Sequence, residues 1–343
     1  MMNQRLAWLF MTLFVVFALF AISKQTTEPK GEIRAALDIG SGATNLKVAR
    51  VDPETNKIIS QIFERSIPVP YQKHLEQSND NNFDQVVKQQ GMQAIKSLKE
   101  IADGYQAKKI IAVATAAFRQ AANAPQFAQE IEKQTGVQVR IINQDEEGIM
   151  AFRGALALSS AEPEKTVVWD IGGGSMQLTT LTESGTYLVE KGKIASISFK
   201  NAIIQQIKQK NIATDPSPNP MTLKEMNTAL DYAGTLALQT DPYILEKIHH
   251  PSTKMIAVGS LFNYGIRPVV NNNQKIEQVE LEMAVYKMAG KTDADLPGGT
   301  LAEVAVSNPL LVLGYMKALQ ISQLEIMQVN NADGALTYPP YWK

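Results

Sequence analysis

The sequence contains no cysteine and only three histidines, at positions 74, 249 and 250. The absence of cysteine excludes disulfide bonds, thiolate catalysis and zinc sites with cysteine ligands. Three histidines, two of them adjacent, argue against a histidine-rich metal site as well. The sequence also lacks a surplus of either charge, because 33 lysines and arginines face 34 aspartates and glutamates. We therefore expect no nucleic acid among its partners.

One local exception to this balance is the stretch from Lys191 to Lys210, which contains five lysines and no acidic residue. A solvated face on a helix near residues 201–210 explains such a stretch, and a track for a polyanion is the functional alternative. We prefer the solvated face.

Long hydrophobic runs are absent except at the N-terminus. The run from Leu6 to Ile22 carries no charge, and its 17 residues reach the lower limit for a membrane span. We therefore expect residues 1–24 to form a single-pass anchor in the inner membrane, followed by a linker over residues 25–32. The alternative is a signal segment that is cleaved near Ser23, with export of the protein to the periplasm.

The most informative feature that is present is a short motif that occurs twice. The two copies are Leu37-Asp38-Ile39-Gly40-Ser41-Gly42 and Trp169-Asp170-Ile171-Gly172-Gly173-Gly174-Ser175. Each aspartate follows an apolar, β-rich run, so each lies at a strand end where its carboxylate can reach a ligand. The glycines let the backbone turn tightly and bring N–H groups close to an anion. Two copies in register predict a phosphate clamp with a metal-holding pair of carboxylates.

Strand-like segments continue after each motif, so each copy is a hairpin rather than the strand-turn-helix of a dinucleotide-binding fold. Hairpin strands followed by alternating helices and strands, twice over, predict two α/β halves with mixed sheets. We expect a first domain over residues 33–158 and a second over residues 159–343. Other expected elements are a buried strand over 109–114, a polar loop over 71–82 and helices over 145–158, 222–238 and 301–319.

Three further segments place polar residues or a turn after a strand, where an open α/β sheet binds ligands. Arg119 follows the buried strand and suits phosphate oxygens, although a surface salt bridge is an equal alternative. Asp145, Glu146 and Glu147 begin a helix, where the helix dipole alone favours acidic side chains. Gly259 forms a glycine turn after a strand, which carries little weight by itself.

In this order the segments resemble the exopolyphosphatase and guanosine pentaphosphate phosphohydrolase family (Ppx/GppA), within the actin, hexokinase and sugar kinase superfamily. The resemblance rests on both Asp-Ile-Gly motifs, on the segment from Ala114 to Ala121, on Glu146-Glu147 and on Asp333-Gly334-Ala335-Leu336. It spans residues 34–336 and implies two duplicated ribonuclease H-like (actin-like ATPase) domains with a cleft between them, preceded by the N-terminal hydrophobic helix.

The resemblance also assigns roles to individual residues. Glu147 matches the general base that activates water for attack on a terminal phosphoryl group, and Arg119 matches an arginine that lines the phosphate path. Asp38 and Asp170 match carboxylates that hold Mg²⁺, with Glu146 as a further candidate ligand. The implied phosphate-binding residues are Gly40, Ser41, Gly42, Gly172, Gly173, Gly174, Ser175 and Gly259.

The function implied by the resemblance is Mg²⁺-dependent release of terminal phosphate from inorganic polyphosphate or from guanosine penta- and tetraphosphate. Two loops depart from the family pattern, because Ser41-Gly42-Ala43 replaces Ser-Asn-Ser and Ser175-Met176-Gln177 replaces Ser-Thr-Glu. A neutral amide thus stands where a carboxylate is expected. The alternative is therefore a membrane-tethered binding or sensing protein that has kept the anion site and lost turnover. A sugar kinase on the same fold is a third interpretation, and a homodimer is compatible with the sequence.

Overall fold

The computed structural model describes residues 31–296 and 299–342. The predicted membrane anchor over residues 1–24 lies outside this range and remains a prediction. Among the residues described, no helix combines the length and the apolar character that crossing a membrane requires.

The first sheet has the spatial strand order β3-β2-β1-β4-β5. The bounds are β1 (Glu32–Ile39), β2 (Ala43–Val51), β3 (Ile58–Pro68), β4 (Ile110–Ala114) and β5 (Gln138–Ile141). The first three strands form an antiparallel meander, whereas β4 and β5 run parallel to β1. Strand β4 is buried nearly throughout because it lies inside the sheet with both faces covered, as its apolar sequence predicts.

Helices cover one face of this sheet. Their bounds are α2 (Tyr71–Glu76), α3 (Gln85–Gly104), α4 (Ala116–Gln120) and α5 (Ala124–Thr135). In α3, Val87, Ile95 and Leu98 recur on one helix face and pack in the core above the strands. The predicted polar loop instead begins with α2, because Tyr71 and Leu75 bury their side chains in the same core.

The second sheet has the order β10-β11-β9-β6-β7-β8. The bounds are β6 (Thr166–Ile171), β7 (Met176–Leu181), β8 (Tyr187–Lys191), β9 (Lys254–Val258), β10 (Lys275–Glu277) and β11 (Gln323–Ile326). The order β8-β7-β6-β9-β11 repeats the whole first sheet with the same strand directions, and β10 extends its edge. The two halves are therefore duplicated α/β units with mixed sheets, as the repeated motif predicts.

One face of the second sheet is also covered by helices. Their bounds are α7 (Ser196–Ala202), α8 (Leu223–Ala237), α9 (Pro242–His249), α10 (Gln278–Tyr286) and α11 (Ser307–Ala318). Trp169 of β6 is fully buried under this layer and contacts Tyr315 of α11, with ring centroids 5.5 Å apart. Helix α11 begins six residues later than the predicted helix over 301–319 (307 − 301), because residues 299–304 form a separate 3-10 helix before it.

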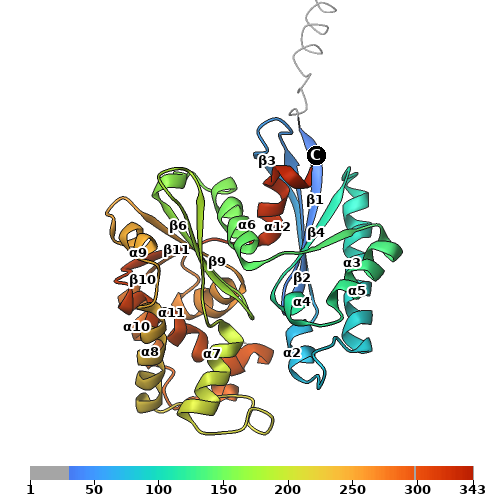
Figure 1. The fold of residues 1–343 in the computed structure, drawn as a ribbon. Coiled ribbons are helices and arrows are strands. Elements are labelled where there is room, and N and C mark those ends of the chain that lie inside the picture. The colour runs from blue at the N-terminus through green and yellow to red at the C-terminus, as the bar shows by residue number, and fades with distance from the viewer. Residues whose placement is uncertain (1–30, 297–298, 343) are drawn as a thin grey trace, which may run out of the picture.

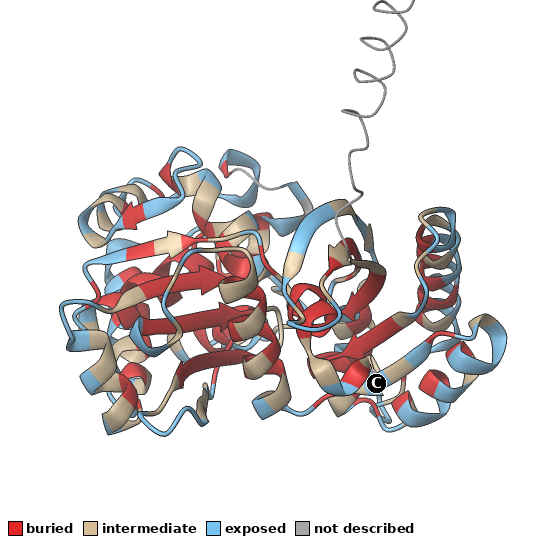
Figure 2. Cartoon of the chain, turned by 90° about the horizontal axis from the view of Figure 1, so that it is seen from above, coloured by how far each residue is buried: buried red, intermediate tan, exposed pale blue. Residues whose placement is uncertain are grey.

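The α-helices α6 (Gln144–Ala157) and α12 (Asn331–Thr337) lie side by side between the two sheets (Figure 1). Each packs on the sheet of the half to which it does not belong in sequence. Helix α6 follows the first sheet but packs on the second, where Phe152 joins Val168 and Ile256. Helix α12 follows the second sheet but packs on the first, where Leu336 joins Val113. The halves thus exchange their last helices, and Figure 2 shows buried residues concentrated in both sheets and between them.

Glycines allow α6 and α12 to approach closely. A Cβ atom on Gly334 of α12 would collide with the backbone of Met150 in α6. A Cβ atom on Gly154 of α6 would lie 2.8 Å from Val329 and 3.1 Å from the backbone nitrogen of Gly334. Because backbone rather than a flexible side chain is on the other side, larger residues at position 334 would push the helices apart.

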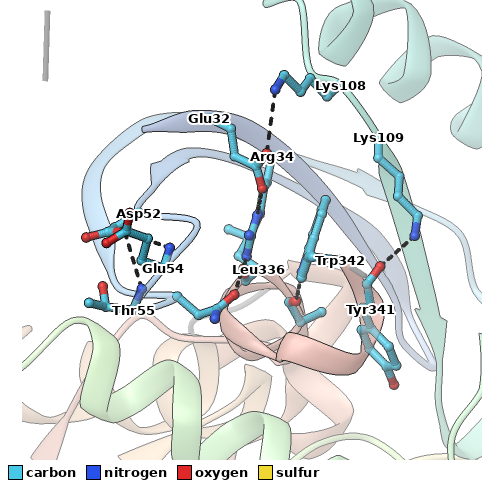
Figure 3. Close-up of polar contacts among 12 residues, drawn as sticks. Glu32, Arg34, Asp52, Glu54, Thr55, Lys108, Lys109, Leu336, Tyr341 and Trp342 are labelled. Atoms are coloured by element: carbon cyan, nitrogen blue, oxygen red, sulfur yellow. Dashed lines mark hydrogen bonds and ion pairs between the residues drawn. The ribbon is translucent and has the colours of Figure 1, made fainter. Parts of the chain in front are cut away.

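Residues from α12 to the C-terminal end of the described chain pack against the first sheet. Basic side chains from β1 and from the residue before β4 hydrogen-bond to their backbone carbonyls (Figure 3). The buried Arg34 of β1 donates from Nη1 to the Leu336 carbonyl at 3.0 Å and lies over the Trp342 ring, 4.6 Å from its centroid. Lys109 donates to the Tyr341 carbonyl at 2.6 Å. The C-terminal residues therefore complete the first half, although they follow the second in sequence.

Candidate active site

The two copies of the repeated motif have the same local geometry. Asp38 at the end of β1 lies opposite Asn45 on β2, and Asp170 at the end of β6 lies opposite Gln177 on β7. In each turn the first glycine N–H donates to the backbone carbonyl three residues later, at 2.9 Å in both copies. The hairpin prediction is thus confirmed in both halves.

The two turns face each other across the halves. A Cβ atom on Gly174 would lie 3.1 Å from Ser41 Oγ and 3.0 Å from the side chain of Ala116. A Cβ atom on Gly173 would lie 3.4 Å from the Ser41 side chain. Glycine at these positions therefore permits the close approach of backbone N–H groups from both turns that binding one anion requires.

The motif aspartates are buried, with 6% of Asp38 and 7% of Asp170 exposed. Burial raises the pKa of Asp38 to about 7, and the negative charge of Glu147 adds to this rise. Burial likewise raises the pKa of Asp170 well above its usual range, and Glu147 and Asp38 both contribute through repulsion. The structure thus brings the three predicted carboxylates close enough to act on one another.

Glu147 is hydrogen-bonded by side chains from both halves. It lies in the first turn of α6, is 4% exposed, and accepts from Arg119 Nη2 at 2.7 Å. Two residues of the second turn also hold it, with Ser175 Oγ 2.9 Å from Oε1 and Gln177 Nε2 3.2 Å from Oε2. Arg119 is itself oriented by a 2.9 Å bond to the Ile142 carbonyl. Charge-assisted bonds of this kind fix a carboxylate in one orientation.

Glu146 is not brought to this cluster. Its Oε2 accepts from the backbone N–H of Asn143 at 2.9 Å, and the Asn143 side chain accepts from the Glu146 N–H at 2.9 Å. This is the reciprocal cap of a helix start. The structure therefore gives Glu146 a structural role in α6 in place of the predicted metal ligation.

Gly259 contributes by having no side chain. Its φ is +95°, and a Cβ atom there would collide with Asp170 Oδ1 and lie 2.6 Å from the Ile171 carbonyl. The residue after β9 thus leaves room for the Asp170 carboxylate beside the backbone, whereas the sequence indicated only a glycine turn.

Sequence reasoning missed one residue of the site and undervalued another. Asn331, at the start of α12, lies beside the Asp38 carboxylate and lowers its pKa against the rise caused by burial, so the second half reaches the first aspartate. Its position after the end of β11 was the available signal. Gln177 was read as the loss of a carboxylate, whereas here it holds Glu147.

The lysines between residues 191 and 210 are paired with acidic or amide side chains. Four of its lysines form ion pairs with acidic residues, and Lys193 donates to Gln239; the pairs are Lys191–Asp145, Lys200–Glu303, Lys208–Glu225 and Lys210–Asp215. These partners offset most of the local positive charge, which favours the solvated-face interpretation over a polyanion track.

Comparison with known proteins identifies the fold. A family model described as the Ppx/GppA phosphatase family matches residues 47–336, so the match begins just after the first copy of the motif. Among solved structures, a Ppx/GppA family member from Aquifex aeolicus is 18% identical, with a TM-score of 0.70 over 89% of this chain and 96% of that one. An exopolyphosphatase from Cytophaga hutchinsonii is 15% identical, with a TM-score of 0.68 over 89% and 96% of the chains.

A curated relative is matched more locally. The bifunctional 3-dehydroquinate synthase/phosphatase of Fusobacterium nucleatum is 25% identical over 241 residues, which cover 63% of this chain and 36% of that protein. The chain thus aligns with about a third of that relative's length. The family match extends over most of the chain and includes Arg119, Glu147 and Asp170. The chain therefore belongs to the Ppx/GppA phosphatase family.

Proposed function

We propose that the chain hydrolyses a terminal phosphoanhydride bond, with inorganic polyphosphate or guanosine penta- or tetraphosphate as substrate and Glu147 as general base. The observation that carries the proposal is the placement of Glu147, a buried carboxylate held by Arg119, Ser175 and Gln177 beside two glycine turns from opposite halves. Such a base needs only to orient water and accept its proton while other groups absorb the charge of the phosphoryl group.

In the proposed step, the water oxygen attacks the terminal phosphorus and its proton passes to the Glu147 carboxylate. The bond from that phosphorus to the bridging oxygen breaks, and the leaving phosphate keeps the bridging oxygen and its electron pair. Backbone N–H groups of the two turns support the phosphoryl oxygens, and the Arg119 guanidinium lies beside the same base.

The donor atoms at the site suit a divalent cation such as Mg²⁺. Asp38 and Asp170 are buried carboxylates, and Asp38 Oδ1 has no hydrogen-bond partner among residues 31–296 and 299–342. In residues 31–296 and 299–342, no group of three or more acidic, histidine or cysteine side chains is placed to hold a metal. Two carboxylates together with substrate phosphates are nevertheless a usual Mg²⁺ site. Asp38 and Asp170 would hold the ion, which supplies charge neutralisation for the phosphoryl oxygens.

Exchange of Glu147 for glutamine tests the assignment of the base. We expect E147Q to keep the fold and to lose phosphate release from polyphosphate by about 10²–10⁴-fold, since the amide accepts no proton from water. The measurement is phosphate release by the purified full chain with Mg²⁺ against polyphosphate, guanosine pentaphosphate and ATP in parallel.

The matched control is E146Q, which makes the same change one residue earlier. Glutamine can serve equally well in the helix cap, so this variant should retain activity within a few-fold. Equal activity of E147Q and the wild-type chain would refute the base assignment. Substrate binding without phosphate release by the wild-type chain would instead assign it a binding or sensing role.

A further inference from the structure

Gln177 has two polar ends that face different partners. Its side chain is 1% exposed, and its Nε2 donates to Glu147 Oε2 at 3.2 Å. A carboxylate at this distance only accepts, so the NH₂ group of the amide must face Glu147. The carbonyl end, Oε1, is therefore directed elsewhere, and it has no hydrogen-bond donor in the part of the chain that the structure describes.

A second buried oxygen, Asp38 Oδ1, also lacks a donor among the residues described. Gln177 lies directly opposite Asp170 in the β6/β7 pair, so both side chains leave the sheet on the same face. Asp170 in turn interacts with Asp38, whose Oδ1 has no partner. A buried acceptor without a partner is destabilising, and native proteins usually satisfy it with a protein donor, a water molecule or an ion.

The chemistry of these atoms indicates what would satisfy them. They are a carboxylate oxygen and an amide oxygen beside a second carboxylate, which is a hard, oxygen-only set that suits Mg²⁺ rather than a softer ion. Gly259 lies so close to Asp170 that a Cβ atom would collide with Oδ1, so no side chain at position 259 occupies this space.

We propose that Gln177 joins the general base to the divalent cation: Nε2 holds Glu147, and Oε1 is a neutral ligand of the ion held by Asp38 and Asp170. The inference rests on the proposed function and assigns a positioning role to the residue that departs from the family pattern. A glutamate at this position would supply a charged ligand but no N–H donor for Glu147.

A neutral ligand at position 177 makes binding of the ion depend on substrate phosphates. With an amide at position 177, the protein offers the ion two negative charges rather than three. Mg²⁺ dehydrates reluctantly and binds such sites together with substrate phosphates. The ion therefore binds this chain as part of a phosphate complex and only weakly without phosphate.

The test measures metal binding without turnover. We expect Mg²⁺ to raise the thermal unfolding midpoint of the wild-type chain only when a non-hydrolysable phosphoanhydride analogue, methylenediphosphonate, is present. Q177E should respond to Mg²⁺ alone, with at least about tenfold tighter apparent binding, equivalent to ~1.4 kcal/mol. Q177M, which has neither amide atom, should show no response to Mg²⁺ with or without the analogue.

The matched control is Q61E. Gln61 also donates from its amide to a buried carboxylate, that of Asp333, but lies outside the proposed cation site. The same charge change there should leave the Mg²⁺ response at the wild-type level. Equal responses to Mg²⁺ alone in Q177E and the wild-type chain would overturn the proposal, as would an unchanged response in Q177M.

This experiment separates the two proposals because it involves no hydrolysis. If no substrate releases phosphate while the response of Q177E to Mg²⁺ differs as expected, the proposed function fails and the role of Gln177 stands. If E147Q abolishes phosphate release while Q177E binds Mg²⁺ like the wild-type chain, only the role of Gln177 fails. Q177M provides a neutral variant of similar size should the added charge in Q177E prevent folding.

Discussion

At the scale of single residues, glycines position the charged groups of the site. Gly259 has a left-handed backbone and its Cα faces the Asp170 carboxylate and the Ile171 carbonyl. We expect G259A to lose about 1–2 kcal/mol from the left-handed conformation and about 1–3 kcal/mol more from the collision. Urea unfolding measures the stability, and phosphate release should fall because Asp170 is displaced.

Gly136 offers the matched control for this substitution. It ends α5 with φ of +73°, and a Cβ atom there would meet nothing within 4 Å. G136A should therefore show only the backbone cost and keep full activity. Equal loss of stability and activity in both variants would mean that the space beside Asp170 plays no part.

The charged residues of the site could be predicted from the sequence, but their partners could not. Asp38, Asp170 and Glu147 follow strands or begin a helix in recognisable motifs, and the structure brings them together. The role of Glu146 as a cap and of Gln177 as a donor depends on which oxygen each side chain reaches. That is set by tertiary packing, which no spacing along the chain contains.

At the scale of elements, the crossing of α6 and α12 depends on Gly334. Its Cα faces the backbone of Met150, so G334A requires the two helices to separate. We expect a loss of about 1–3 kcal/mol or more in unfolding free energy and weaker activity, because Glu147 lies on α6 and Asn331 on α12. Urea unfolding and phosphate release measure the two effects.

Gly234 of α8 serves as the comparison for G334A. It is also within a helix, but a Cβ atom there would lie 3.7 Å from Ala318, an ordinary contact. G234A should therefore stabilise the chain by up to about 1 kcal/mol, the difference in helix propensity. A stabilising effect of G334A would show that α6 and α12 separate without cost.

Elements with a clear period or an apolar run could be predicted from the sequence, and the short buried helix α12 could not. Helix α8 lies within one residue of its prediction at each end, since its polar and apolar faces alternate at helical spacing. Helix α12 has seven residues, all buried, so it has no amphipathic pattern to reveal it. The exchange of α6 and α12 between the sheets is likewise a tertiary feature.

At the scale of the whole molecule, the exchanged helices make each half depend on the other. A fragment of residues 33–158 would contain α6 without the sheet that buries Phe152, and the first sheet would lack Leu336. We expect this fragment, and the fragment of residues 159–343, to show no cooperative thermal transition when expressed alone. Circular dichroism during heating measures this.

Co-expression of the two fragments supplies the control. Each would then provide the helix that the other lacks, so a complex with a cooperative transition should be recovered. Cooperative unfolding of either fragment alone would contradict this dependence and would favour the predicted boundary at residue 158 as a division between independent domains. The homodimer remains a prediction from the sequence.

The position of α12 in the sequence also affects how the protein is made. Strands β1 to β5 leave the ribosome early, yet the face that holds Ala36 and Val113 packs against residues 331–342, which are made last. At typical rates of translation the chain between them takes roughly 10–40 s to make. During that interval the nascent first half lacks the part of its core that α12 supplies, so its folding is completed only at the end of synthesis.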